Sequence, residues 1–431
     1  MRLPGLSGLS VLVVFFLIAT DPASAAGQAA DRIAAGKALA VAADCVACHT
    51  VQGGQPFAGG LAMPLPMGDI YSTNITPDRQ TGIGNYSEQD FANVLRKGLR
   101  RDGGNLYPAM PYPSYTKFSD DDIANLYVYF MQGVAPVRQP NRAPDFPWPL
   151  TMRWPLKIWN ALYLREGAYV PKPGRDAEWN RGAYLVQGAA HCGTCHTPRG
   201  IGMQELAYDE TGVGYLAGAP LAGWQAFNIT HDRDAGIGTW TTAQIVQYLR
   251  TGNVPGKAQA AGPMAEAVEH SFSRMSERDL NAIAVYLSTV PAAKGADTAP
   301  RSTQGRPTDD YVAIRAAAAA GGRTPAGASL YLDHCASCHG MTGAGTTDGF
   351  FPSLFANSAV GTATASNLLQ VVMHGASVNN GTTHYFMPAF QTELDDDEVV
   401  TLVNYLSERF GNGRARVSAA EVAKIRTAPA H

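Results

Sequence analysis

The 431-residue sequence is poor in charge. Charged residues make up 16% of it, whereas hydrophobic residues reach 45%; soluble proteins average about 25% charged residues. This composition supplies enough apolar side chains for a packed core and argues against global disorder. The formal net charge is −3 and no Lys/Arg-rich block is present, so the sequence lacks the electrostatic pattern of a nucleic-acid-binding protein.

Long apolar runs are also scarce. Residues 1–25 resemble an export signal, with Arg2, an apolar run from Val11 to Ala19 and a small-residue cleavage site at Ala23-Ser24-Ala25. A membrane anchor is the alternative, but a bilayer-spanning helix needs about 20 apolar residues. No later stretch is apolar for that length. We therefore expect an exported protein that begins at Ala26 and is periplasmic, either soluble or peripheral on the inner membrane.

Cysteine is rare, and its spacing is informative. Six cysteines are too few for a disulfide scaffold in a chain this long. All six fall in three copies of C-x-x-C-H, which are Cys45, Cys48 and His49; Cys192, Cys195 and His196; and Cys335, Cys338 and His339.

This motif is typical of covalent c-type haem attachment. Two thiols one helical turn apart add to the two vinyl groups of a haem, and the adjacent imidazole binds the iron. A redox-active cysteine pair or a zinc site is the alternative, although zinc-binding C-x-x-C pairs lie closer together in sequence. Three copies with no cysteine left over favour three covalently bound haem c groups.

The sequence around the motifs repeats. Each motif follows a Gly-x-x-Leu segment that begins at Gly36, Gly182 or Gly327, and glycine in a helix permits close approach of another helix. Each unit ends in a capping pattern followed by an amphipathic helix, with caps at Ser119, Ser276 and Asp395 and a tyrosine ten residues later at Tyr129, Tyr286 and Tyr405.

We therefore expect an all-α fold of three tandem cytochrome c-type domains, each wrapped round a covalent haem. The predicted boundaries are a signal peptide at 1–25, domain 1 at 26–137, a connector at 138–178, domain 2 at 179–290, a linker at 291–325, domain 3 at 326–410 and a tail at 411–431.

The three segments outside these domains differ in composition. Residues 138–180 hold seven prolines and four tryptophans, so the connector lies either against a partner or the membrane, or across its own two domains. Residues 291–325 are rich in Ala, Gly, Pro and Thr and are typical of a plain linker. We expect a solvated polar tail; a short helix at 417–425 on an anionic surface is the alternative.

The second axial ligand of each iron is expected to be a methionine in a stiff loop between the haem motif and the capped helix. Met110 and Met387, each followed by proline, meet this condition. In the second unit Met264 and Met275 both qualify by order. Met264 is preferred because it lies in a Gly/Pro loop, 36 residues after Asn228, as Met110 lies 36 residues after Asn74. Core packing is the alternative role for any of these methionines.

A further repeat lies near the haem motifs. Asn74-Ile75-Thr76 and Gly82-Ile83-Gly84 recur as Asn228-Ile229-Thr230 and Gly236-Ile237-Gly238, each with an aspartate between, and the third unit lacks them. These polar groups either donate hydrogen bonds to haem propionates or form a turn shared by descent.

With these motifs, the chain resembles the triheme cytochrome c subunit of membrane-bound bacterial dehydrogenases, a group that serves alcohol, gluconate, sorbitol, fructose and FAD-dependent glucose dehydrogenases. The resemblance covers nearly the whole mature chain, including the Asn74 loop, Tyr107 to Tyr115 around Met110, and Met387-Pro388-Ala389-Phe390. It implies that electrons pass from a catalytic subunit's flavin or quinone cofactor along the haems to ubiquinone or another acceptor. Similar cytochromes serve molybdenum-dependent enzymes, so the partner's cofactor stays open.

Three iron sites closed by His and Met favour electron transfer over catalysis. We therefore predict a non-catalytic electron-transfer subunit with a dehydrogenase partner, peripheral membrane contact and no nucleic-acid partner. A multihaem peroxidase with one open iron site, which would be the site of Met264, and a free-standing periplasmic carrier are the alternatives.

Overall fold

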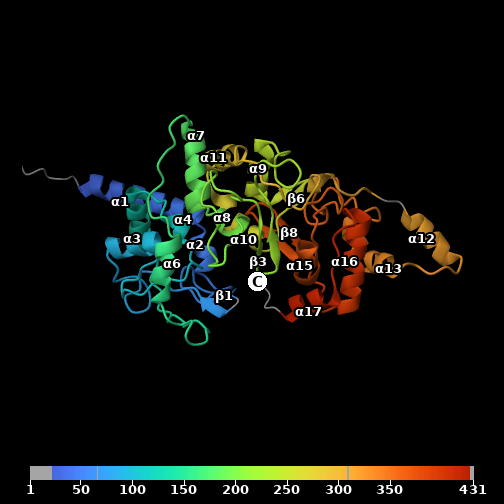
Figure 1. The fold of residues 1–431 in the computed structure, drawn as a ribbon, viewed down its shortest axis with the longest axis horizontal. Coiled ribbons are helices and arrows are strands. Elements are labelled where there is room, and N and C mark those ends of the chain that lie inside the picture. The colour runs from blue at the N-terminus through green and yellow to red at the C-terminus, as the bar shows by residue number, and fades with distance from the viewer. Residues whose placement is uncertain (1–21, 66, 308–309, 428–431) are drawn as a thin grey trace, which may run out of the picture.

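The computed structural model describes residues 22–65, 67–307 and 310–427. Helix α1 lies toward one end of the long axis in Figure 1 and α12 at the other. The N-terminal part contains α1 (Pro22–Ala42), α2 (Cys45–Cys48), β1 (Ala62–Leu65), β2 (Gly68–Tyr71), α3 (Glu88–Lys97), α4 (Tyr112–Tyr115), α5 (Asp120–Val128) and the π-helical turn η1 (Tyr129–Gly133).

The middle part, green and yellow in Figure 1, lies between the other two. It contains α6 (Pro155–Tyr163), α7 (Ala177–Tyr184), η2 (Leu185–Ala189), α8 (Gly193–His196), β3 (Ala219–Leu221), β4 (Trp224–Ala226), α9 (Thr242–Thr251), β5 (Asn253–Val254), β6 (Ala258–Gln259), α10 (Pro263–His270), η3 (Phe272–Arg274) and α11 (Glu277–Leu287).

The C-terminal part, orange and red in Figure 1, forms the opposite end of the molecule from α1. It contains η4 (Arg301–Thr303), α12 (Asp310–Ala319), α13 (Ala326–His334), α14 (Ala336–His339), α15 (Ser366–His374), β7 (Ala376–Asn379), β8 (His384–Met387), α16 (Asp396–Phe410) and α17 (Ala419–Thr427).

The fold is mostly helical, as predicted, with little sheet. In the described residues the strands form four separate two-stranded antiparallel hairpins. Hairpins this short are not stable alone and depend on the helices around them. The hairpin β7–β8 matters most, because it pairs Met387 with Ala376 and so holds a predicted iron ligand on a rigid element.

Three helix pairs organise the molecule: α1 packs on α5, α7 on α11 and α13 on α16. A Cβ added at Gly36 would lie 2.1 Å from the carbonyl oxygen of Asn125, and one added at Gly182 would lie 2.0 Å from that of Ala282. At Gly327 it would lie 2.5 Å from Cβ of Tyr405. The predicted close approach at these glycines is therefore confirmed.

The capped helices also form as predicted. Ser119 and Ser276 are the N-caps of α5 and α11, and each side chain accepts a hydrogen bond from the backbone N–H three residues later. Asp395 forms a reciprocal capping box with Glu398 at the start of α16. These caps fix where each helix begins, and thus which residues face its partner.

Buried side chains form two cores. One runs through the first two parts of the chain and includes Leu39, Phe118, Leu185 and Ile283. The other belongs to the C-terminal part, with Phe410 among its fully buried residues. Because the first core is shared, the segments that carry the first two C-x-x-C-H motifs are packed together as one body.

The connector at 138–178 packs across the two parts that it joins, which was one of the two alternatives left open by the sequence. The indole N–H of Trp159 donates to the carbonyl of Gly202 at 2.7 Å, and the hydroxyl of Tyr112 donates to Asn160, so α6 joins the first and second parts. Trp148 and Trp154, in contrast, are 80% and 64% exposed. The connector thus packs across its own chain and still presents apolar side chains to the outside.

The segment 291–325 differs from the predicted plain linker. Arg301 is 7% exposed, and the ring of Tyr311 stacks on Tyr331 at 5.4 Å while its hydroxyl lies 2.6 Å from that of Tyr405. The Ala/Gly/Pro-rich composition gave no indication that Arg301 and Tyr311 would be buried. These two side chains hold the segment against the middle and C-terminal parts of the chain.

The C-terminal tail is not a solvated coil. It forms α17, whose Val422 is fully buried in the second core. Arg426 pairs with Asp396 at 2.7 Å and donates to the carbonyl of Leu394. Ala415 and Val417, just before the helix, are buried in the same core. These apolar contacts and the ion pair dock the tail on its own chain.

Most of the predicted signal peptide lies outside the described residues; the predicted cleavage site after Ala25 falls within α1. Among residues 22–65, 67–307 and 310–427, no helix has the length and apolar character to cross a bilayer.

Candidate haem-binding sites

Each C-x-x-C-H motif lies on or beside a short helix, α2, α8 or α14, that directly follows a longer one. Asp44 and His191, which precede the first and second motifs, have left-handed backbone conformations with φ of 50° and 35°. Asp and His adopt this region more readily than most non-glycine residues, and here it turns the chain from the preceding helix into the motif.

The thiols do not have the chemistry of a redox-active pair. Burial raises the pKa of Cys45, Cys192 and Cys335 to about 12 in each case. Redox-active C-x-x-C cysteines have lowered pKa values that keep the nucleophilic thiolate populated. A raised pKa keeps these three thiols protonated, which does not suit thiol–disulfide exchange.

The three motif histidines are oriented in the same way. Nδ1 donates to a backbone carbonyl in each case: His49 to Thr73 at 2.6 Å, His196 to Phe227 at 2.6 Å and His339 to Pro352 at 2.8 Å. A proton on Nδ1 leaves the Nε2 lone pair free to bind iron.

Burial lowers the pKa of all three imidazoles, so they are neutral, as a metal ligand must be. The residues present therefore fit haem c. The sequence indicated the histidines but not these carbonyl partners; the one available signal was that Asn74 and Asn228 directly follow two of them.

The repeated Asn-Ile-Thr loop serves to hold the backbone. Asn74 accepts from the N–H and hydroxyl of Thr76 at 2.9 and 2.7 Å, and its Nδ2 donates to the carbonyl of Val137 at 2.7 Å. Asn228 makes the same bonds to Thr230 and donates to the carbonyl of Ala293. These bonds use the side-chain amide within the chain, which favours the shared turn over a propionate donor.

The third motif lies in a well-defined cavity. Its empty volume is about 1320 Å³, part of which is open to solvent. Residues of the C-terminal part that line it include Cys335, Cys338, His339, Pro352, Met387 and Phe390, and Gly252, Asn253 and Ala260 of the middle part complete the wall. The structure thus brings Met387 and His339 to one cavity with both cysteines, at a place where two parts of the chain meet.

Met110 and Met264 are half-buried at the edge of the shared core. Met110 lies just before α4, and the hydroxyl of Tyr115 at the end of this helix donates to the carbonyl of Ala43, two residues before the first motif. Met264 lies in the first turn of α10, which contacts α2. Met275, the alternative, is 5% exposed and its sulfur accepts a weak hydrogen bond from Ser271.

The first and second motifs are neighbours in space. Tyr115 contacts His191, which precedes the second motif, with ring centroids 5.7 Å apart. The hydroxyl of the same Tyr115 donates to Ala43 just before the first motif. Tyr115 therefore brings together the segments that precede the first two motifs.

Two family models match parts of the chain. Residues 33–133 match "Cytochrome c", and residues 322–406 match "Cytochrome C oxidase, cbb3-type, subunit III". These segments contain the first and third C-x-x-C-H motifs.

Relatives match over nearly the full length. The gluconate 2-dehydrogenase cytochrome c subunit of Pantoea cypripedii is 44% identical over 97% of this chain and 95% of its own. The cytochrome c subunit of the quinone alcohol dehydrogenase of Gluconobacter oxydans is 42% identical over 97% and 88%, and the fructose dehydrogenase cytochrome subunit of Gluconobacter japonicus is 42% identical over 94% and 85%. This chain belongs to the family of haem-binding, electron-transferring cytochrome c subunits of bacterial dehydrogenases.

Proposed function

We propose that this chain is a triheme cytochrome c that relays electrons from a partner dehydrogenase to ubiquinone or another respiratory acceptor. Three tandem cytochrome c-type domains carry haem c at Cys45/Cys48, Cys192/Cys195 and Cys335/Cys338. The iron ligands are His49 with Met110, His196 with Met264, and His339 with Met387.

One observation carries this proposal: all three histidines are held alike. Each is neutral and donates from Nδ1 to a backbone carbonyl at 2.6 to 2.8 Å. Haem c, when bound, supplies one-electron chemistry whose potential depends on its axial ligands. The chain supplies imidazoles whose orientation is fixed by hydrogen bonds, so that little needs to move when charge passes.

The packing of the middle part supports a relay in which the second site lies between the other two. Helix α10, which begins beside Met264, contacts α2 of the first motif and strand β7 of the third. Asn379 in β7 donates its N–H to the carboxylate of Glu269 in α10 at 3.3 Å. Helix α10 of the middle part therefore links the first motif to the hairpin that carries Met387.

The partner is a catalytic dehydrogenase subunit. The three relatives quoted above serve gluconate, alcohol and fructose dehydrogenases by name, and the partner's own cofactor is a flavin, a quinone or molybdenum. To test this, the full chain carrying an affinity tag is purified from the native membrane fraction, and gluconate, ethanol and fructose are added while the haem absorbance is recorded.

We expect a dehydrogenase to copurify and one of these substrates to reduce the haems. Purification of the chain alone from a membrane fraction that retains dehydrogenase activity would contradict the proposal. A high-spin haem in the native protein together with efficient peroxide reduction by the isolated chain would also contradict it, because an open iron site has the chemistry of a peroxidase.

The site of action is the periplasmic face of the inner membrane, reached by export and by peripheral contact. Trp148, Leu150, Trp154, Ile158 and Leu162 are all at least 45% exposed and follow one another through the connector and α6. Exposed tryptophan and leucine on a short helix are typical of surfaces that lie in a membrane interface.

Sedimentation with phosphatidylglycerol vesicles tests this contact. Trp154→Ser combined with Leu162→Ser is expected to reduce binding severalfold, whereas Val312→Ser, which changes a residue 77% exposed on α12, is expected to leave binding unchanged. Equal binding of the wild type, the double variant and Val312→Ser to the vesicles would contradict the membrane contact.

A further inference from the structure

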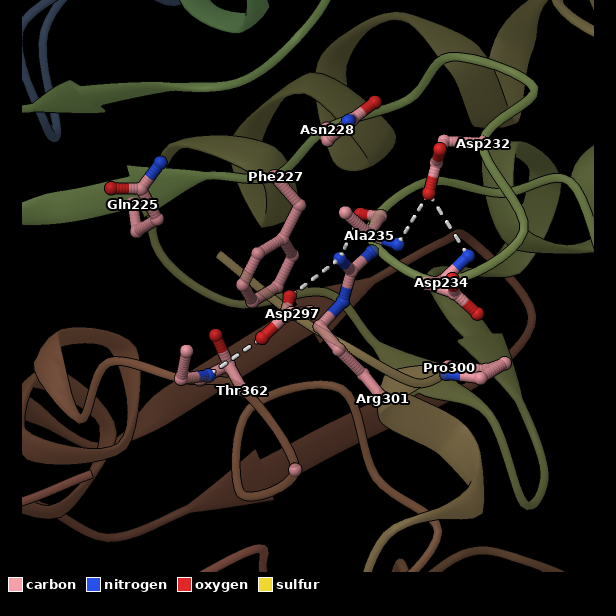
Figure 2. A network of polar contacts seen from close by, with 12 residues as sticks. Gln225, Phe227, Asn228, Asp232, Asp234, Ala235, Asp297, Pro300, Arg301 and Thr362 are labelled. Carbon is pink, nitrogen blue, oxygen red and sulfur yellow. Dashed lines mark hydrogen bonds and ion pairs between the residues drawn. The ribbon is translucent and has the colours of Figure 1, made fainter. Parts of the chain in front are cut away.

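A buried arginine lies between the second and third parts of the chain. Arg301 of η4 is 7% exposed, and its guanidinium lies over the ring of Phe227, with Cζ 4.4 Å from the ring centroid. Nη1 donates to the carbonyl of Ala235 and to Oδ2 of Asp297, the latter at 3.2 Å. Asp297 in turn accepts from the N–H of Ala363 at 2.7 Å. Figure 2 shows this network.

The guanidinium is only partly satisfied by the protein. Both hydrogen bonds come from Nη1, and the buried Nε has no hydrogen-bond partner. A buried charged donor without a partner is costly. The edge formed by Nε and Nη2 has the geometry that binds a carboxylate through two parallel hydrogen bonds.

This unpaired edge lies beside the second haem motif. Phe227 links the two, because its carbonyl accepts from Nδ1 of His196 at 2.6 Å while its ring supports Arg301. Ala235, the other contact of Arg301, belongs to the loop that Asn228 begins directly after Phe227. The arginine is therefore fixed against the same loop that orients the iron-binding imidazole.

At the corresponding place of the first motif, a neutral side chain makes the equivalent contact. By the repeat, Ala235 corresponds to Thr81, seven residues after Asn74. The carbonyl of Thr81 accepts from Nδ2 of Asn141 at 3.0 Å, a neutral amide on an exposed residue. The two loops are alike in backbone, and the buried cation distinguishes the second.

We propose that Arg301 binds a propionate carboxylate of the haem attached to Cys192 and Cys195, through the edge that contains Nε, and so raises the reduction potential of that haem. The proposal rests on the proposed function, since it assumes haem at the second motif. The ferric state carries one more positive charge than the ferrous state, so a fixed cation nearby favours reduction. The anchor also ties the segment 291–325, and through Asp297 the third part of the chain, to the second haem.

The test uses the full-length haem-loaded protein and three variants: Arg301→Gln, Arg301→Lys and Arg306→Gln. Arg306 is exposed on the same segment, so its replacement removes an equal charge away from the network. Covalently bound haem is counted first by mass. The midpoint potentials are then titrated optically, and the propionate-bending bands are recorded by resonance Raman spectroscopy.

We expect Arg301→Gln to lower the reduction equilibrium constant of one haem about tenfold, a shift of about 59 mV for a one-electron couple, and to move one propionate band. One charge about 10 Å away at an effective dielectric constant of about 20 has an effect of this size. Arg306→Gln should leave the midpoint potentials and the propionate bands unchanged. Arg301→Lys keeps the charge but loses the pair of parallel guanidinium N–H donors. It should therefore move the propionate band but change the midpoint potential less than Arg301→Gln does.

Identical potentials and Raman bands in Arg301→Gln and Arg306→Gln would overturn the proposal. If Arg301→Gln fails to fold, Arg301→Lys decides, because an unchanged propionate band in that variant would equally overturn it. A wild-type protein with no haem at the second motif would instead refute the proposed function, so the two failures are distinguishable.

Discussion

The crossing of α7 and α11 at Gly182 offers a sharp test of the packing. A Cβ at Gly182 would lie 2.0 Å from the carbonyl oxygen and 2.7 Å from the carbonyl carbon of Ala282, and 2.8 Å from Cβ of Tyr286. None of these atoms can rotate away, so Gly182→Ala must separate the helices by roughly 1.5 Å to restore ordinary contact. The ion pair between Arg181 and Asp279, at 2.7 Å across this interface, would loosen as well.

The magnitude follows from two opposing effects. Overpacking of a rigid core site costs about 3 kcal/mol at the upper end of its usual range. Replacing glycine by alanine inside a helix returns about 1 kcal/mol. We therefore expect a net loss of about 2 kcal/mol, or roughly 4 to 8 °C in Tm for a cooperative unit of about 150 to 250 residues.

Thermal unfolding of the haem-loaded protein, followed by far-ultraviolet circular dichroism, measures this loss. Gly27→Ala is the matched control, because Gly27 also lies in a helix but has no atom within 4 Å of the added Cβ. It should leave Tm unchanged or slightly raised. If Gly182→Ala has the same Tm as the wild type, the close approach of α7 and α11 is refuted.

Three further predictions concern the sites. Asn228→Ala removes the bonds to Thr230 and Ala293 and should lower the free energy of unfolding by about 2 kcal/mol in denaturant titrations; no loss would refute the role of the loop. Met387→Ala should remove about one third of the near-infrared thioether-to-iron absorbance that three His/Met-ligated haems would give. The control Met341→Ala, at a residue 40% exposed, should retain this absorbance. An unchanged spectrum in Met387→Ala would exclude Met387 as a ligand. Burial raises the pKa of Glu205 to about 7 from its usual 4.5, so the folded state binds this proton more tightly than the unfolded state. The contribution of Glu205 to stability is therefore most favourable at acid pH and falls as the pH rises from about 4.5 toward 7. Glu205→Gln should therefore raise stability by up to about 3 kcal/mol at pH 8 and by little at pH 4, and an equal effect at both pH values would contradict the raised pKa.

Features set by local sequence were predictable here. Ser119, Ser276 and Asp395 cap helices because a short polar side chain needs only the N–H three residues later. Gly36 and Gly182 mark helix crossings because glycine alone leaves room for a neighbouring backbone. The three C-x-x-C-H motifs needed no tertiary information, since their spacing within one helical turn already determines which atoms lie together.

Features that depend on distant contacts were not predictable. The carbonyl of Phe227 orients His196. The identity of the Phe227 side chain does not indicate that its backbone carbonyl accepts this hydrogen bond. Arg301 and Val422 stand among small or polar residues, and only the chain packed around them decides that they are buried. The prediction of a solvated tail was wrong for this reason, because a few apolar residues, Val417 and Val422 among them, reach the core despite the polar composition.

The central claim is that each C-x-x-C-H motif carries one covalently bound haem closed by histidine and methionine. The most direct test is the intact mass of the purified chain, measured after denaturation so that only covalent groups remain. We predict the mass of the polypeptide plus three haems. A mass with two or fewer attached haems would contradict the account.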